Sequence, residues 1–90
     1  MRKINIKPGT PVRVNWVDAT SPQAGWDTPR EKYELGRANS LGFVITHDKE
    51  SLTIAPHVIE TSENQSIGDP MILPWGMITD IQEVRSRKLK

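Results

Sequence analysis

The clearest periodicity in the chain is an alternation of apolar and polar residues over Val12-Arg13-Val14-Asn15-Trp16. Apolar side chains at every second position are typical of a β-strand that is buried on one face. We therefore expect Val12, Val14 and Trp16 to face the core and Arg13 and Asn15 to face water.

A second alternating unit follows in the middle of the chain. Leu41, Phe43 and Ile45 alternate with Gly42, Val44 and Thr46, and a second alternating run covers residues 52–58. The polar run 47–51 separates the two, which predicts an antiparallel hairpin in which facing residue numbers add up to about 98 or 99. Because proline has no N–H to donate, we expect Pro56 to mark an edge or a bulge.

Outside these two units the periodicity is lost. Before the first unit, Pro8-Gly9 predicts a turn that ends an N-terminal arm, residues 1–10. From Asp18 to Asn39 we expect a long loop, a length that is uncommon in a compact domain and often functional. Residues 30–35 are compatible with a turn and a half of helix, and Trp26, Tyr33 and Leu35 are expected to pin this loop to the core.

The C-terminal part predicts two more strands. Residues 60–69 are polar and are expected to form a loop, and 71–73 form a short apolar strand. Pro74-Trp75-Gly76 interrupts it, and we expect one tight turn leading into a final strand within 77–84. The alternative is a C-terminal helix over 77–88, which is disfavoured because Ile and Thr are mediocre helix formers.

Five short strands separated by turn residues favour an all-β fold that closes on itself. We predict a single domain, residues 1–90, built as a small five-stranded Src-homology-3-like or Sm-like barrel with a long loop after its first strand. Such barrels commonly place a proline and a single helical turn before the last strand, as 73–78 does here.

Several segments together are similar to a known group. Val14-Asn15-Trp16-Val17-Asp18-Ala19 precedes Gly25-Trp26, then Ser40-Leu41-Gly42-Phe43-Val44-Ile45, Leu52-Thr53-Ile54-Ala55, and Ile72-Leu73-Pro74-Trp75-Gly76-Met77-Ile78-Thr79-Asp80-Ile81. Over residues 11–84 the chain resembles a loose group of small uncharacterised proteins encoded by bacteriophages and prophages. The resemblance implies a phage accessory protein acting in a bacterial cytoplasm, and it implies no activity and no site residue.

Composition excludes several kinds of chemical site and bears on the location of the protein. The chain has 90 residues, no cysteine, 36% hydrophobic residues and a net charge of +1. Disulfides, thiol nucleophiles and thiolate metal sites are therefore excluded, and the lack of cysteine suits a reducing cytosol. No apolar run approaches a membrane span, and the N-terminus lacks the apolar stretch of a signal peptide. We expect no membrane association and a cytoplasmic location.

Candidate chemistry is sparse. The only histidines, His47 and His57, fall on neighbouring strands of the predicted hairpin about 16 Å apart, too far to share one metal ion. Asp18 and Asp27 flank the long loop, but Asp18 is expected to end its strand by accepting local backbone N–H groups. No nucleophile or phosphate-loop motif is present, so we expect no enzymatic activity and no cofactor.

Three tryptophans in 90 residues offer contact area. Trp16 is expected in the core, whereas Trp26 and Trp75 fall in loops, where an exposed indole is a common interface anchor. The alternative is that both cap the ends of the barrel. We predict that Trp26, Tyr33 and Trp75 form a protein-interaction surface.

Charge is distributed unevenly. Residues 1–13 carry four basic and no acidic residues, residues 85–90 again carry four basic and no acidic residues, and residues 14–84 have a net charge of −7. The first and last strands of a small barrel commonly lie side by side, so the two basic ends can pool into a patch for a phosphate backbone. The residues of this alternative are Arg2, Lys3, Arg85, Arg87, Lys88 and Lys90.

Three function classes remain. The favoured one is a non-enzymatic module that binds a protein, either a second copy or a host factor. The alternative is a nucleic-acid-binding barrel that uses the basic ends. The third, a small-molecule or enzyme site shared across an oligomer interface, is the least favoured.

Overall fold

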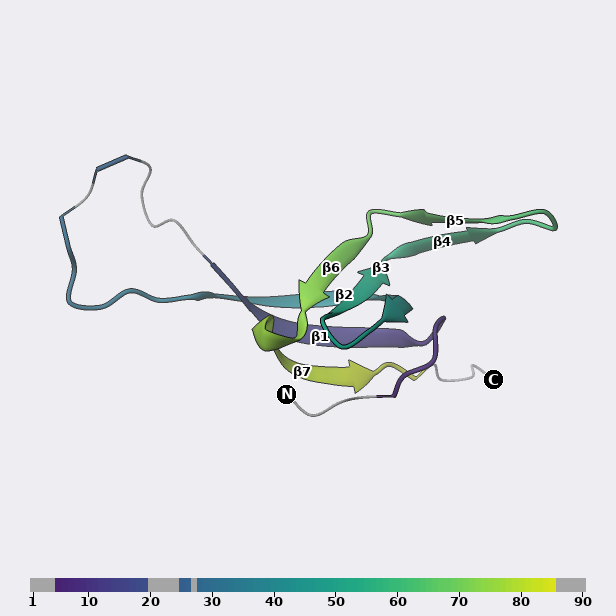
Figure 1. Cartoon of the computed structure of the whole chain (residues 1–90), viewed down its shortest axis with the longest axis horizontal. Coiled ribbons are helices and arrows are strands. Elements are labelled where there is room, and N and C mark those ends of the chain that lie inside the picture. Colours follow the sequence, from purple (N-terminus) through teal and green to yellow (C-terminus); the bar gives the residue numbers. More distant parts are fainter. Residues whose placement is uncertain (1–4, 20–24, 27, 86–90) are drawn as a thin grey trace, which may run out of the picture.

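The computed structural model describes residues 5–19, 25, 26 and 28–85, and these form an all-β fold (Figure 1). A five-stranded antiparallel sheet has the order β6-β3-β2-β1-β7, and a separate two-stranded sheet pairs β4 with β5. The strands are β1 (Pro11–Asp18), β2 (Gly36–His47), β3 (Ser51–Ala55), β4 (His57–Glu60), β5 (Gln65–Gly68), β6 (Met71–Pro74) and β7 (Ile78–Glu83), with the 3-10 turn η1 (Trp75–Met77) between β6 and β7.

The predicted closed barrel is not found. In the described residues β6 pairs only with β3 and β7 only with β1, so both remain edges of an open sheet joined by η1. The coarser prediction, an all-β fold, is confirmed.

β1 follows its alternation except at Asn15, which was expected to face water but is half-buried, with its Oδ1 enclosed and without a hydrogen-bond partner. Val12 and Val14 are fully buried, and Trp16 packs against the core with its Nε1 donating to Ser40 Oγ at 3.0 Å. The core of the sheet consists of Val12, Val14, Val44, Leu52, Ile54, Leu73 and Ile78. We call the side of the sheet that carries these residues the inner face and the opposite side the outer face.

The predicted hairpin is confirmed in register. Phe43 faces Ala55 and His47 faces Leu52, partners whose numbers add up to 98 and 99, with a register shift between Val44 and Thr46. The alternation does not show which side chains of β2 face the core: Val44 is buried, whereas Leu41 is 64% exposed. β1 decides this phase, because Gly42 lies opposite the buried Val12 and Leu41 opposite the exposed Arg13.

Gly42 allows the end of β3 to approach β2 closely. A Cβ at this position would lie 3.1 Å from Ala55 O and 3.2 Å from Ala55 C, both backbone atoms. A side chain at residue 42 would therefore push β3 away from β2, which explains a glycine at an inward position within a strand.

The turn at Pro8-Gly9 forms as predicted. Gly9 has φ +91°, which glycine adopts at little cost, and Thr10 N donates to Lys7 O at 3.2 Å. The turn also lies against β2, since Gly9 N donates to Val44 O at 2.7 Å and Val44 N donates to Thr10 O at 2.9 Å.

The polar segment 60–69 was predicted as a loop, and this is wrong. It contains the turn 61–64 and strand β5, which pairs with β4. Partner numbers add up to 125 both in the β3–β6 ladder and in the β4–β5 ladder, so the two ladders are one long hairpin with a break. Pro56 and Pro70 stand at the break, where neither can donate to a ladder.

The alternative prediction of a C-terminal helix over 77–88 is also wrong for the described residues, because 78–83 is strand. The predicted tight turn before this strand is confirmed as η1. Residues 30–35 form no helical turn. The expectation that Trp26, Tyr33 and Leu35 pin the long loop is wrong as well, because these side chains are 97%, 52% and 60% exposed.

Two segments project from opposite sides of the sheet (Figure 1): residues 28–35 with the start of β2, and the β4–β5 hairpin. The radius of gyration is 16.7 Å with extents of 56 × 33 × 26 Å. A compact domain of this length has a radius of about 12 Å. The excess follows from the two projections.

Leu52 and Leu41 provide a matched test of the two faces. Leu52→Ala removes a fully buried side chain, and we expect a loss of about 2–5 kcal/mol in the free energy of unfolding. Leu41→Ala, on the outer face, is expected to change it by less than about 0.5 kcal/mol. Urea denaturation at low protein concentration measures both, and equal losses would contradict the assignment of the faces.

Candidate interaction site

Trp75, predicted as a contact residue, is engaged within the chain. Its Nε1 donates to Asp48 O at 2.6 Å and its backbone N to Glu50 O at 3.2 Å. Its ring meets that of His47 nearly edge to face, at 6.2 Å between centroids and 76° between planes. Trp75 therefore ties η1 to the turn between β2 and β3 and is only partly accessible to a partner.

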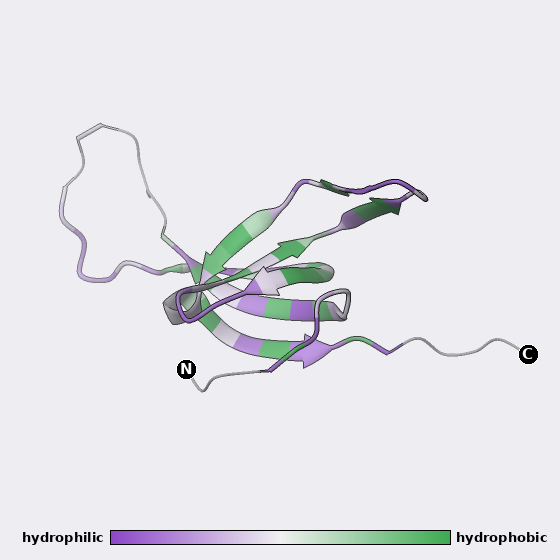
Figure 2. Cartoon of the chain, turned by 45° about the vertical axis from the view of Figure 1, so that its right-hand side comes forward, coloured by the Kyte–Doolittle hydropathy of each residue, from purple (hydrophilic) through white to green (hydrophobic). Residues whose placement is uncertain are grey.

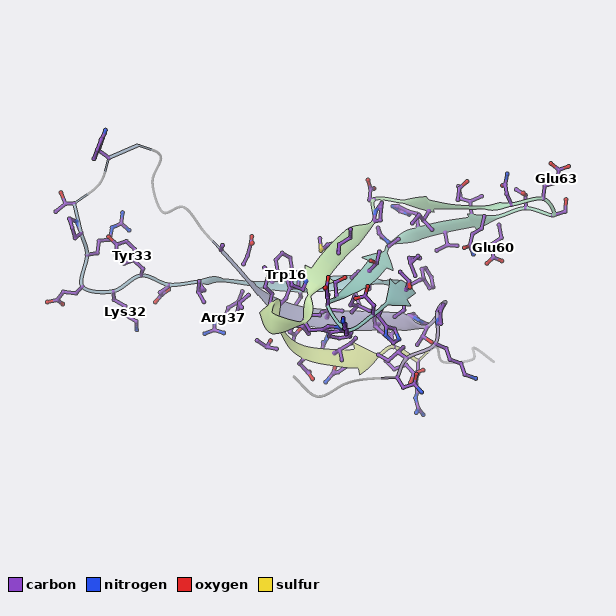
Figure 3. All side chains as sticks on the ribbon, viewed as in Figure 1. Trp16, Lys32, Tyr33, Arg37, Glu60 and Glu63 are labelled. Carbon is purple, nitrogen blue, oxygen red and sulfur yellow. The ribbon has the colours of Figure 1, made fainter. Side chains whose placement is uncertain are left out.

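Trp26 and Tyr33 are both exposed, and Tyr33 lies on the segment that projects away from the sheet (Figure 3). Tyr33 Oη accepts a hydrogen bond from Arg30 N at 2.9 Å, and the Arg30 guanidinium lies 5.7 Å from the Tyr33 ring centroid. Trp75 instead packs against the core of the sheet, so the three predicted contact residues do not form one surface.

The residues of the basic alternative lie mostly outside the described part of the chain; this holds for Arg2, Lys3, Arg87, Lys88 and Lys90. Arg85 is exposed just after β7. The prediction that the first and last strands lie side by side is confirmed, because β1 pairs with β7 and Val84 N donates to Pro11 O at 2.9 Å.

The histidines and aspartates do not assemble a site. A ring nitrogen of His47, Nε2, lies 2.8 Å from Ile6 O, and His57 is exposed at the start of β4. Asp18 ends β1 opposite Gly36, and Asp27 lies outside the described residues. Within the described part of the chain, no three His, Cys, Asp or Glu residues are placed to hold a metal ion.

An apolar groove on the outer face is the feature that the sequence analysis missed. Leu41 and Phe43 of β2 and Val84 beyond β7 are 64%, 37% and 42% exposed. They surround a groove of about 220 Å³, hereafter the outer groove, lined by Pro11, Val12, Leu41, Gly42, Phe43, Pro56 and Val84. The sequence did not reveal it because Leu41, Phe43 and Ile45 form the more apolar phase of 41–46, which alternation alone would place toward the core.

A second, larger cleft lies between the Pro8-Gly9 turn, β2 and the β4–β5 hairpin. It measures about 460 Å³ and is lined by Pro8, Gly9, Phe43, Val44, Ile45, Val58, Glu60 and Gln65. Its polar rim is internally paired, since Gln65 Nε2 donates to Glu60 Oε1 at 2.9 Å.

Comparisons with protein-family models, with curated proteins and with solved structures gave no match. Among the described residues, no helix has the length and apolar character needed to cross a membrane.

The β2–β3 turn that supports Trp75 is held by the carboxylate of Asp48. Hydrogen bonds from the backbone N–H groups of Glu50 and Ser51, at 2.8 and 2.9 Å to Oδ1, lower the pKa of Asp48 below its ordinary value of 3.8. Since the pKa is lowered on folding, the carboxylate stabilises the fold above pH 3.8, and this stabilisation is lost as the pH falls through the lowered value.

We therefore expect Asp48→Ala to lower the melting temperature at pH 7, because two turn N–H groups lose their acceptor. The difference from wild type should shrink as the pH falls below 3.8 toward the lowered pKa of Asp48, because protonation of the wild-type carboxylate weakens the same two hydrogen bonds. Thermal melts followed by circular dichroism at pH 7 and pH 3 measure both values. A constant difference would show that the charge of Asp48 contributes nothing.

Proposed function

We propose that this chain is a non-enzymatic protein-interaction module, a phage-type accessory protein that acts in the bacterial cytoplasm by binding another protein surface. The observation that carries the proposal is the outer groove, where Leu41, Phe43 and Val84 are exposed around one depression. Contiguous exposed apolar side chains mark interaction sites more often than single ones do.

The strands that form this surface are firmly held. β1 is hydrogen bonded to β2 on one side and to β7 on the other, which fixes the positions of Leu41 and Val84 relative to each other. A preorganised apolar surface loses little conformational freedom when a partner binds. Polar side chains adjoin it, including Arg13, whose guanidinium donates to Gln82 Oε1 at 2.6 Å. An apolar centre with a polar rim is the usual anatomy of an interface.

The strand order also supports a finer description of the fold. The order β6-β3-β2-β1-β7, with a 3-10 turn before the last strand, is compatible with the topology of a Src-homology-3-like sheet. In this proposal the β4–β5 hairpin is an extension of the hairpin formed by β3 and β6.

The test uses the outer groove directly. We expect immobilised wild-type protein to retain a specific partner, from a bacterial lysate or as further copies of itself, and Leu41→Ser to reduce the retained amount at least about tenfold. Thr53→Ser, a conservative change on β3, serves as the matched control. Equal retention by wild type and Leu41→Ser would contradict a role for this groove.

A second candidate function is nucleic-acid binding, favoured by one observation. The hydrogen bond from Val84 N to Pro11 O joins the start of β1 to the end of β7, so Arg13 and Arg85 lie near the same end of the sheet, next to both basic segments of the sequence. Under this alternative, positive residues of both ends contact one phosphate backbone.

For this alternative, replacing Arg85, Arg87, Lys88 and Lys90 by Ala should abolish retardation of DNA or RNA in a gel at low salt. Affinity should also fall steeply as salt is raised, because each neutralised phosphate releases counterions. If the wild-type protein retards neither DNA nor RNA at low salt, the alternative is eliminated.

A further inference from the structure

The β4–β5 hairpin, hereafter the arm, is a structural element with little support from its own chain. It projects from the sheet on the side opposite to residues 28–35 (Figure 1) and has only two strands. A two-stranded hairpin alone is marginally stable in water. The ladder is interrupted at its root, where Pro56 cannot donate a hydrogen bond and Asp69 adopts φ +54°.

The arm carries both apolar area and negative charge. Ile59 and Ile67 are 64% and 38% exposed, and they belong to opposite faces of the arm, because Ile59 pairs with Ser66 and Ile67 with Val58. Residues 57–69 contain Glu60, Glu63 and Asp69 and no Lys or Arg, for a net charge of −3. Figure 2 shows the hydrophilic turn at the tip beyond strands that carry apolar residues.

The outer groove has the complementary chemistry. Its lining is apolar, and its neighbours include Arg13, directly opposite Leu41, and Arg85, next to Val84. Glu83 is an acidic residue at the same end of the sheet, but it pairs with Val12 and so belongs to the inner face. In the sequence, the two segments that adjoin this end of the sheet are the strongly basic parts of the chain, whereas the arm belongs to the acidic part.

We propose that the occupant of the outer groove is the arm of a second copy of this chain, with Ile59 of the arm against Leu41 and Phe43 and the arm carboxylates facing Arg13 and Arg85. This inference rests on the proposed function and names its partner. Pro56, at the root of the arm, also lines the groove. The arm and the groove are therefore adjacent on each copy, so two copies exchange arms reciprocally, and a two-fold dimer satisfies both sites.

A charge exchange tests the pairing. One variant, Glu60→Lys with Glu63→Lys, gives a basic arm; the other, Arg13→Glu with Arg85→Glu, gives an acidic groove. Either variant alone places like charges together, and we expect its dimer dissociation constant to rise about tenfold in about 50 mM salt. Mixed in equal amounts, the two variants regain opposite charges at both contacts, and the mixture should dimerise with nearly wild-type affinity.

A matched control reverses two basic residues elsewhere. Lys32 lies on the segment that projects away from Glu60 and Glu63, and Arg37 lies near the start of β2, where this segment joins the sheet (Figure 3). Lys32→Glu with Arg37→Glu should therefore leave the dissociation constant unchanged. Ile59→Ser tests the apolar part of the contact and is expected to weaken the dimer at least about tenfold. Sedimentation equilibrium measures all variants, and circular dichroism confirms that each one folds.

The outcomes separate the two proposals. A wild-type protein that stays monomeric up to about 200 µM, or a mixture that dimerises no better than its components, overturns arm exchange. If Leu41→Ser then still loses a captured partner, the interaction function stands with a different occupant in the groove. If Leu41→Ser changes neither capture nor dimerisation, the proposed function itself fails.

Discussion

The structure depends on the double pairing of β1. This strand bonds to β2 from Pro11 to Asp18 and to β7 from Val12 to Trp16, and it contributes the fully buried Val12 and Val14 to the core. A central strand of this kind fixes its neighbours twice, by hydrogen bonds along the ladder and by burial of alternate side chains. The phase of β2 and the position of β7 both follow from it.

That phase has a direct consequence for function. Because successive side chains of a strand point to opposite faces, placing Gly42 and Val44 on the inner face puts Leu41 and Phe43 on the outer face. A slip of one residue would bury Leu41 and expose Val44. The register that completes the core thus also creates the apolar outer groove that we propose as the interaction site.

The arm also follows from a strand register. The ladder of β3 and β6 continues in the same register into β4 and β5, and prolines on both strands interrupt it where the sheet ends. Beyond the prolines, a hairpin with exposed isoleucines and three carboxylates has few neighbours of its own. An element of this type gains stability when a second surface covers it, which is the physical basis of the proposed arm exchange.

Local periodicity was sufficient to predict several elements. Strong alternation marked β1 and the β2–β3 register, and proline with glycine marked the turns at Pro8-Gly9 and before β7. The same signals were insufficient for β5, because residues 60–69 are mostly polar. Their pairing follows the register of the β3–β6 ladder, which continues into β4 and β5. Open sheet edges replaced the predicted closed barrel for a comparable reason, since closure depends on strand twist and spacing that no local pattern records.

The candidate site shows the same division. Charge and aromatic area could be assigned from the residues alone, and the predicted small-barrel topology already placed the first and last strands side by side. The contact of Trp75 with Asp48 and the outward orientation of Leu41 follow from the packing of the folded chain. The reason is that alternation alone would turn Leu41 and Phe43, the more apolar phase of 41–46, toward the core, whereas pairing of Gly42 with the buried Val12 of β1 places Val44 there instead.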